Sequence, residues 1–238
     1  MTNMNLGPST PSALDYFATL VGSDSQFPLM EAAISLAQDE YPQLDLQAVL
    51  SEVDQLQARL QRRWQGNPDP VRTLAVLNQF FFRDLGFAGN VNDYYDPDNS
   101  FIHAVLRTRR GIPISLAVLW LELAGSVGLR AQGVGFPGHF LVKVVTPQVN
   151  GGQIVLDPFT GQVLDQDTLL EWLGPMRWPP SGMTEAQRQH AWLQRHLEPA
   201  RPRHILARML RNLLEIYRTQ GDEPRGQAVQ RRLDVLGV

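Results

Sequence analysis

The longest apolar stretch of the sequence, Gly111–Leu129, constrains the fold more than any other feature. It carries Glu122 near its middle and Ser115 near its start, and a membrane span would place both polar groups in hydrocarbon at a high cost. Pro113 suits the first turn of a helix, because the N–H that proline lacks is not needed there. We therefore interpret the stretch as a buried helix over 113–127, and we expect no membrane partner.

The segment before this helix is mostly helical in its periodicity. Apolar residues recur at helical spacing and predict helices over 28–40, 45–60, 70–85 and 100–106. Asp45 and Ser100 are candidate N-caps for two of these helices. The polar segment 89–100, rich in Asn, Asp and Tyr, is expected to be a long loop.

The segment after the apolar helix changes in character. It is rich in valine and phenylalanine, and it predicts an antiparallel sheet with strands over 131–136, 139–145, 153–156 and 162–164. The pairs Thr168–Glu171 and Thr184–Gln187 have capping-box spacing and predict the starts of two further helices. A helical hairpin over 203–219 and 224–236 ends the chain as one tetratricopeptide-sized unit without a second copy. The whole pattern predicts an α+β fold.

Charge is unevenly distributed along the chain. From Arg188 onward there are ten arginines and five acidic residues, a net charge of +5, whereas residues 1–187 carry −8. A Pro/Gly-rich joint over 174–182 precedes this change and suggests two modules. Four arginines of the last helices are spaced mainly by seven: Arg201, Arg208, Arg211 and Arg218. They would form a solvated face or bind an acidic protein partner. Because no aromatic residues are interleaved with them, we expect no nucleic-acid partner.

Composition excludes several kinds of site. The absence of cysteine rules out disulfides, thiolate metal sites, iron–sulfur clusters and a cysteine nucleophile. His190, His196 and His204 lack zinc-motif spacing, so we expect no metal ion and no other cofactor. The first residues show no basic segment followed by an apolar run, so no signal peptide is expected. A cytoplasmic protein fits these observations.

Three residues lie in contexts that suit nucleophilic catalysis. Ser115 lies in the first turn of the apolar helix, His139 opens a predicted strand, and Asp157 closes the next one. A nucleophile at a helix N-terminus gains from the dipole, a histidine takes its proton, and a carboxylate orients the imidazole. Each residue also has a structural alternative. Ser115 could bond to backbone, His139 to a neighbouring carbonyl, and Asp157 could begin the turn at Asp-Pro.

The polar loop and a neighbouring arginine are candidate substrate-binding groups. Asn92, Tyr94 and Tyr95 could line a cleft, or the loop could simply pack its tyrosines. Arg110 could hold an acidic group beside the site, or it could cap a helix end.

The segment 77–161 resembles the transglutaminase-like core of the SirB-type family of bacterial proteins. The stretches that carry this resemblance are Asn-Gln-Phe-Phe (78–81), Leu-Gly-Phe (85–87), Gly-Asn (89–90), Asn-Asp-Tyr-Tyr-Asp-Pro (92–97), Arg-Arg-Gly-Ile-Pro-Ile-Ser-Leu-Ala (109–117), Gly-Val-Gly-Phe-Pro-Gly-His-Phe-Leu-Val (133–142) and Asp-Pro-Phe (157–159). Each stretch alone is common, but together they are specific.

The resemblance implies an α+β, papain-like core that is preceded and followed in the sequence by helices. It implies an N-terminal helical layer (1–66), the transglutaminase-like core (67–182) and C-terminal tetratricopeptide-like helices (183–238). The superfamily uses Cys, His and Asp in this order, so Ser115 stands where the cysteine would be, with His139 and Asp157 in the other two roles. Thiol-dependent transglutamination is thereby excluded, because a serine hydroxyl is far less acidic than a thiol and needs an aligned base.

Two functions follow as hypotheses. The first is a protein or peptide-binding, regulatory member of this fold with a modified Ser-His-Asp site and a partner on residues 188–238. The second is a serine-dependent acyl hydrolase, an amidase or peptidase, with Ser115 as nucleophile, His139 as base and Asp157 as its orienting group. A Ser115 hydroxyl within hydrogen-bond reach of His139 would favour the hydrolase, and a buried hydroxyl bonded only to backbone would favour the binding protein.

Overall fold

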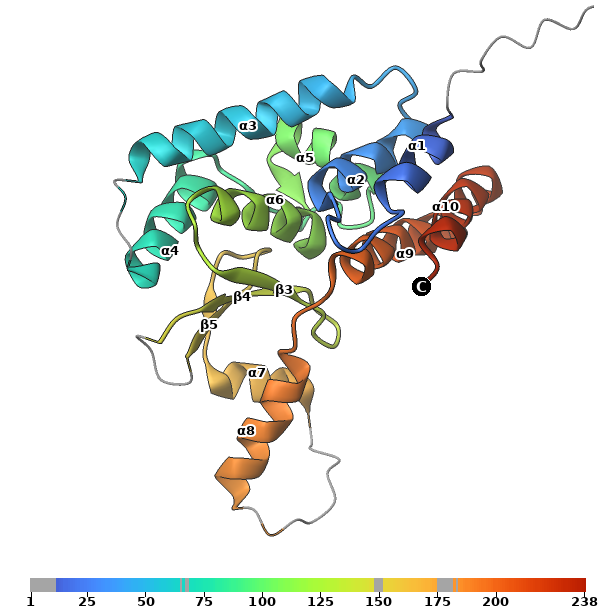
Figure 1. The fold of residues 1–238 in the computed structure, drawn as a ribbon. Coiled ribbons are helices and arrows are strands. Elements are labelled where there is room, and N and C mark those ends of the chain that lie inside the picture. Colours follow the sequence, from blue (N-terminus) through green and yellow to red (C-terminus); the bar gives the residue numbers. More distant parts are fainter. Residues whose placement is uncertain (1–11, 65, 67–68, 148–151, 175–181, 183) are drawn as a thin grey trace, which may run out of the picture.

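The computed structural model describes residues 12–64, 66, 69–147, 152–174, 182 and 184–238. Most helices gather on one side of a small sheet, and two helices lie on its other side (Figure 1). Helices and a small sheet together agree with the predicted α+β class. Within the described residues, no helix has both the length and the apolar character that a membrane crossing requires.

The helices before the sheet are α1 (Ala13–Leu20), α2 (Leu29–Ser35), the 3-10 turn η1 (Leu36–Asp39), α3 (Leu46–Arg63), α4 (Pro70–Asn78), the π-helical turn η2 (Gln79–Asp84), the 3-10 turn η3 (Pro97–Ser100), α5 (Ile102–Thr108) and α6 (Pro113–Ser126). Several of them begin at a side chain that accepts from a free backbone N–H group, among them α1, α3 and α4. Asp45 caps α3 as predicted, because its side chain accepts from the Ala48 N–H. The sequence reasoning missed α1, which begins at a capping box of Ser12 and Asp15.

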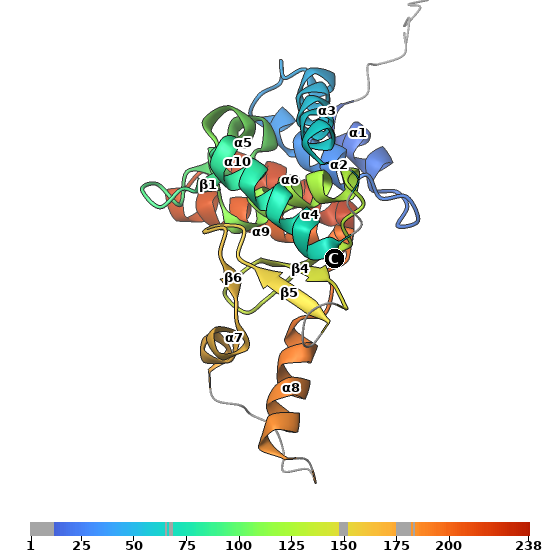
Figure 2. The same cartoon turned by 90° about the vertical axis from the view of Figure 1, so that its left-hand side faces the viewer.

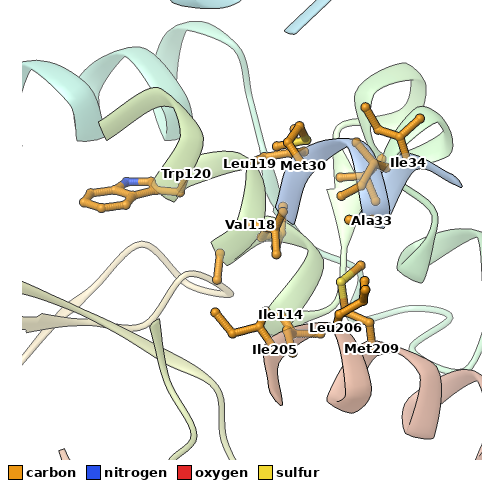
Figure 3. Close-up of a cluster of buried hydrophobic side chains, with 14 of the residues drawn as sticks. Met30, Ala33, Ile34, Ile114, Val118, Leu119, Trp120, Ile205, Leu206 and Met209 are labelled. Atoms are coloured by element: carbon orange, nitrogen blue, oxygen red, sulfur yellow. The ribbon is translucent and has the colours of Figure 1, made fainter. Parts of the chain in front are cut away.

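Helix α6 is the centre of the main core, as its apolar sequence predicts. Figure 3 shows side chains of α6 between those of α2 and those of α9 (Pro202–Gln220). The labelled residues of this cluster are Met30, Ala33, Ile34, Ile114, Val118, Leu119, Trp120, Ile205, Leu206 and Met209. All ten are buried. The last helices therefore share one hydrophobic core with the first ones.

The sheet is antiparallel, as predicted, with strands in chain order: β3 (Ala131–Val134), β4 (Leu141–Val145), β5 (Gln153–Leu156) and β6 (Val163–Leu164). Because side chains alternate along β4, Val142 and Val144 join the main core. Leu141 instead joins a second cluster with Leu169 of α7 (Gln166–Leu173) and Leu193 of α8 (Glu185–His196). Helices α7 and α8 thus lie on the face opposite α6, as both views show (Figures 1 and 2).

The chain ends in the predicted hairpin of α9 and α10 (Glu223–Leu236). Its buried Arg232 donates to the carboxylate of Asp39, at the end of η1, over 2.6 Å, and its guanidinium lies over the Phe17 ring of α1. The capping box Thr184–Gln187 opens α8 as predicted. Residues 175–181 of the Pro/Gly-rich joint lie outside the described residues.

Two predicted caps are wrong. Asp165, rather than Thr168, caps α7, because its carboxylate accepts from the Thr168 N–H over 2.8 Å. Phe101, rather than Ser100, is the N-cap residue of α5, and it supplies no side-chain bond. Ser100 ends the preceding 3-10 turn instead. At α7 two polar residues compete for the cap and sequence spacing alone does not decide between them, whereas α5 begins without any side-chain cap.

Candidate functional site

Ser115 lies in the first turn of α6, as predicted, but its side chain faces backbone rather than solvent. The residue is fully buried. Its hydroxyl donates to the Asn99 carbonyl over 2.6 Å and accepts from the Ile112 N–H over 3.1 Å. A Cβ on Gly111 would lie 2.7 Å from this oxygen, so the pocket around it is filled. The hydroxyl therefore joins the start of α6 to the loop that ends at Asn99.

Asn99 extends this connection to the tyrosine loop, which we define as residues 90–96. Its side-chain amide donates to the Asp93 carbonyl over 2.6 Å and to the Tyr94 carbonyl over 3.3 Å. Its amide oxygen accepts from the Asn90 side chain over 3.0 Å. Buried polar groups that are fully bonded in this way hold a loop in one conformation. Ser115 thus contributes, through Asn99, to the position of the two tyrosines.

His139 lies in the loop between β3 and β4; the prediction that it opens a strand is wrong, because β4 begins at Leu141. The backbone N–H of His139 donates to the Phe136 carbonyl over 3.0 Å and so forms the turn over residues 136–139. Gly138 has the positive φ of 71° that this turn requires. The imidazole stacks on Trp172 of α7 with 4.1 Å between ring centroids and 15° between planes. Trp172 packs against the second cluster, on the face of the sheet away from α6.

Asp157 follows β5 and organises the turn after it. One carboxylate oxygen accepts from the Phe159 N–H over 2.9 Å, and the other accepts from the Thr160 hydroxyl over 2.8 Å. The Asp157 carbonyl accepts from the Gly161 N–H over 2.8 Å. This side chain is buried, and its two oxygens serve the Asp-Pro turn.

The three predicted catalytic side chains each have separate partners. Among the described residues, no hydrogen bond joins the His139 ring to Ser115 or to Asp157. Nor do the described residues place three His, Asp or Glu side chains where they could hold a metal ion. As arranged, Ser115 and Asp157 position loops, and His139 packs against a tryptophan.

The predicted binding residues divide into two groups. Asn92, Tyr94 and Tyr95 are exposed on the tyrosine loop, with 42% of Tyr94 and 70% of Tyr95 open to solvent. The two tyrosine rings contact each other edge to face, and Tyr94 also contacts Phe159. Arg110 instead donates to the carbonyls of Gly86 and Arg109, so its guanidinium is used within the fold.

Arg208 is a residue of this region that the sequence reasoning named only as one of four arginines on a stripe that is solvated or binds an acidic partner. It lies on α9, and it is half-buried. Its guanidinium lies over the Phe140 ring, 5.6 Å from the centroid, and donates to the Phe136 carbonyl over 3.4 Å. Burial lowers the pKa of Arg208, whereas the nearby Tyr94 raises it. A cleft of about 740 Å³ opens beside it, between the β3–β4 loop and α9.

The signal for Arg208 was weak in the sequence. Its spacing from the other arginines of α9 predicts one exposed stripe, and Arg201, Arg211 and Arg218 are indeed exposed. Nothing in that spacing distinguishes the one arginine that the β3–β4 loop covers. No sequence pattern indicated that Trp172 stacks on His139 or that Asn99 bonds to Ser115, because both contacts join segments far apart in the chain.

Comparison with known proteins identifies the family. Residues 47–211, more than half of the chain, match the family model described as "Transglutaminase-like superfamily". The chain belongs to the transglutaminase-like superfamily. This transglutaminase-like match begins in α3 and ends in α9, so it includes the tyrosine loop, Ser115, His139, Asp157 and Arg208. No solved structure matches the chain.

The curated relatives of this transglutaminase-like chain include bacterial proteins. It is 40% identical over 201 residues to a "UPF0162 protein" of Xylella fastidiosa, covering 82% of this chain and 66% of that protein. It is 32% identical over 146 residues to a "UPF0162 protein" of Vibrio cholerae, covering 61% and 53%. Over 72 residues it is 40% identical to "F-box only protein 21" of Mus musculus, covering 30% of this chain and 12% of that protein. The chain thus spans less than two thirds of these relatives, and the SirB-type resemblance stays a prediction.

Ser115 offers a test of its burial that uses the absence of cysteine. Ser115→Cys would carry the only thiol of the protein. Because the native hydroxyl is fully buried, we expect a thiol reagent such as DTNB to react with folded Ser115→Cys at least about a hundredfold more slowly than with the urea-unfolded variant.

The matched control is Thr160→Cys in the neighbouring turn, which is partly exposed and should react readily in the folded protein. Circular dichroism would verify that both variants are folded. Rapid reaction of folded Ser115→Cys would contradict the buried position and would favour an open nucleophile site.

Proposed function

We propose that this protein is a peptide- or protein-binding member of the transglutaminase-like superfamily, in which the Ser-His-Asp positions hold the loops of the binding site. The observation that carries this proposal is the Ser115 hydroxyl, which is buried and bonded to backbone. A serine nucleophile needs a hydrogen bond to a base and an open path to substrate. Ser115 has neither among the described residues.

The tyrosine loop supplies the binding surface in this proposal. Tyrosines give large contact areas at a low cost in side-chain entropy, and they are enriched where proteins recognise one another. The side chains of Tyr94 and Tyr95 are exposed, whereas the backbone of their loop accepts hydrogen bonds from the buried Asn99 amide. A fixed loop with exposed aromatic side chains loses little freedom when a peptide binds.

A displayed library of random peptides tests this function. We expect immobilised protein to enrich peptides with a common sequence pattern, and we expect the variant Tyr94→Ala/Tyr95→Ala to lose at least about tenfold in affinity for them, as truncating interface anchors commonly does. Val163→Ala is the control, because Val163 is an exposed apolar residue of β6. Failure to enrich any pattern, or equal binding by the double variant, would contradict the proposal.

The serine hydrolase remains the alternative prediction, and a fluorophosphonate probe separates it from binding. We expect no labelling of the wild type, since such probes need an activated serine. Labelling that Ser115→Ala abolishes would overturn the proposed function and would assign acyl hydrolysis to Ser115, His139 and Asp157.

A further inference from the structure

The cleft beside Arg208 has an uncommon electrostatic feature. Arg208 is half-buried, yet none of the described carboxylates forms an ion pair with it, and the nearby Tyr94 raises its pKa against the effect of burial. Arginines in such positions are generally paired, because burying a charge without a partner is unfavourable. Its contacts within the fold are one long bond to a carbonyl and the Phe140 ring.

Arg211 adds a second positive charge beside Arg208. Arg211 and His204 lie one helical turn away on either side, and both line the same cleft. Glu198 is the acidic side chain at the cleft, and it interacts with Lys143, whose ammonium lies against the end of α8. Two arginines therefore line an opening with one acidic side chain, Glu198, and with Val238, the last residue of the sequence, whose α-carboxylate is a second anion there.

The geometry is suited to a planar anion. The guanidinium lies over the Phe140 ring and makes one long bond to the Phe136 carbonyl, so these contacts restrict its position before a ligand arrives. A guanidinium recognises a carboxylate through two parallel N–H···O bonds. The cleft volume of about 740 Å³ lies within the range of about 300–1,000 Å³ that ligand sites occupy.

We propose that this cleft binds a carboxylate of an acidic peptide segment through Arg208, with Arg211 adding charge and Tyr94 contacting the adjoining residue. The inference rests on the proposed function and names its ligand class. Charge complementarity favours a peptide carboxylate, because the cleft combines two arginines with the apolar Phe140, and the exposed Tyr94 lies close enough to Arg208 to affect its pKa. Neutral peptides would leave Arg208 without a partner on binding.

Fluorescence anisotropy with two pools of labelled octapeptides tests this ligand class. Both pools have uncharged side chains at seven positions, and the remaining position is Glu in the first pool and Gln in the second. We expect the full-length protein to bind the Glu pool about tenfold more tightly, and Arg208→Gln to abolish that preference. Arg208→Lys should retain only part of it, since lysine keeps the charge but lacks the planar fork.

Arg218→Gln is the matched control, an exposed arginine at the other end of α9 that should keep the full preference. Thermal melts would verify that each variant is folded. Equal binding of the two pools would overturn this inference while leaving the proposed function in place. Binding of neither pool would overturn both, and tighter binding of single-stranded oligouridine than of the Glu pool would replace the peptide with a nucleic acid.

Discussion

Replacing Trp120 by alanine is expected to lower the free energy of unfolding by about 3–5 kcal/mol, the range found for removing a large aromatic side chain from a core. Trp120 is fully buried on α6 and extends away from the α2 side chains (Figure 3). Its indole N–H donates to the Asn78 side chain over 3.0 Å, at the end of α4. The alanine variant would lose this packing and leave a cavity beside a polar amide.

Urea unfolding followed by far-ultraviolet circular dichroism measures this loss. Trp120→Phe is the matched control, because it keeps an aromatic ring and removes the hydrogen bond to Asn78. We expect Trp120→Phe to lower the free energy of unfolding by less than about half as much as Trp120→Ala does, since the hydrogen bond alone contributes roughly 1 kcal/mol. A loss below about 1 kcal/mol for the alanine variant would mean that α6 does not organise the core as described.

Replacing Gly89 by alanine is the second change with a large expected effect. Gly89 lies in β1 (Ala88–Gly89), which pairs in parallel with β2 (Arg110–Gly111). Its N–H donates to the Phe159 carbonyl over 2.9 Å, and an added Cβ would lie 2.3 Å from the Phe159 ring. The ring, or the Asp-Pro turn that carries it, must therefore move.

We expect Gly89→Ala to destabilise the protein by about 1–3 kcal/mol, as overpacking does. Because Phe159 contacts Tyr94, we also expect weaker peptide binding at the tyrosine loop. Gly125→Ala is the control: no atom lies near its added Cβ in α6, and alanine favours helix over glycine by about 0.5–1 kcal/mol. Chemical unfolding and anisotropy together test both effects, and unchanged values for Gly89→Ala would contradict the close contact with Phe159.

The two variants separate the parts of the molecule that matter for the proposed function. Trp120 tests the helix on which Ser115 is placed, whereas Gly89 tests the contact of β1 with Phe159, which also contacts Tyr94. If Gly89→Ala weakens peptide binding more than its loss of stability can explain, this contact contributes to recognition directly. If binding is unchanged in folded protein, recognition lies elsewhere on the surface.

Local features explain why much of the fold could be predicted. Helix α3 begins at Asp45 because a carboxylate there bonds to a free N–H, and that requires only neighbours in sequence. The antiparallel strands followed from short valine-rich runs separated by turns. Where two polar residues competed for one role, as Asp165 and Thr168 did at α7, sequence spacing gave the wrong residue.

The sequence by itself predicted most helices and strands in their chain order, the buried α6 and the superfamily, because each depends on local pattern or on motifs read in order. It left open whether the tyrosines pack within their loop or line a cleft. The tertiary structure alone decided which side chains meet. It placed His139 on Trp172, bonded Ser115 to Asn99, and brought Arg208 of α9 to the β3–β4 loop. Periodicity tells which face of a helix is apolar, but only the packing of distant segments determines which groups lie against that face and whether a polar side chain reaches solvent.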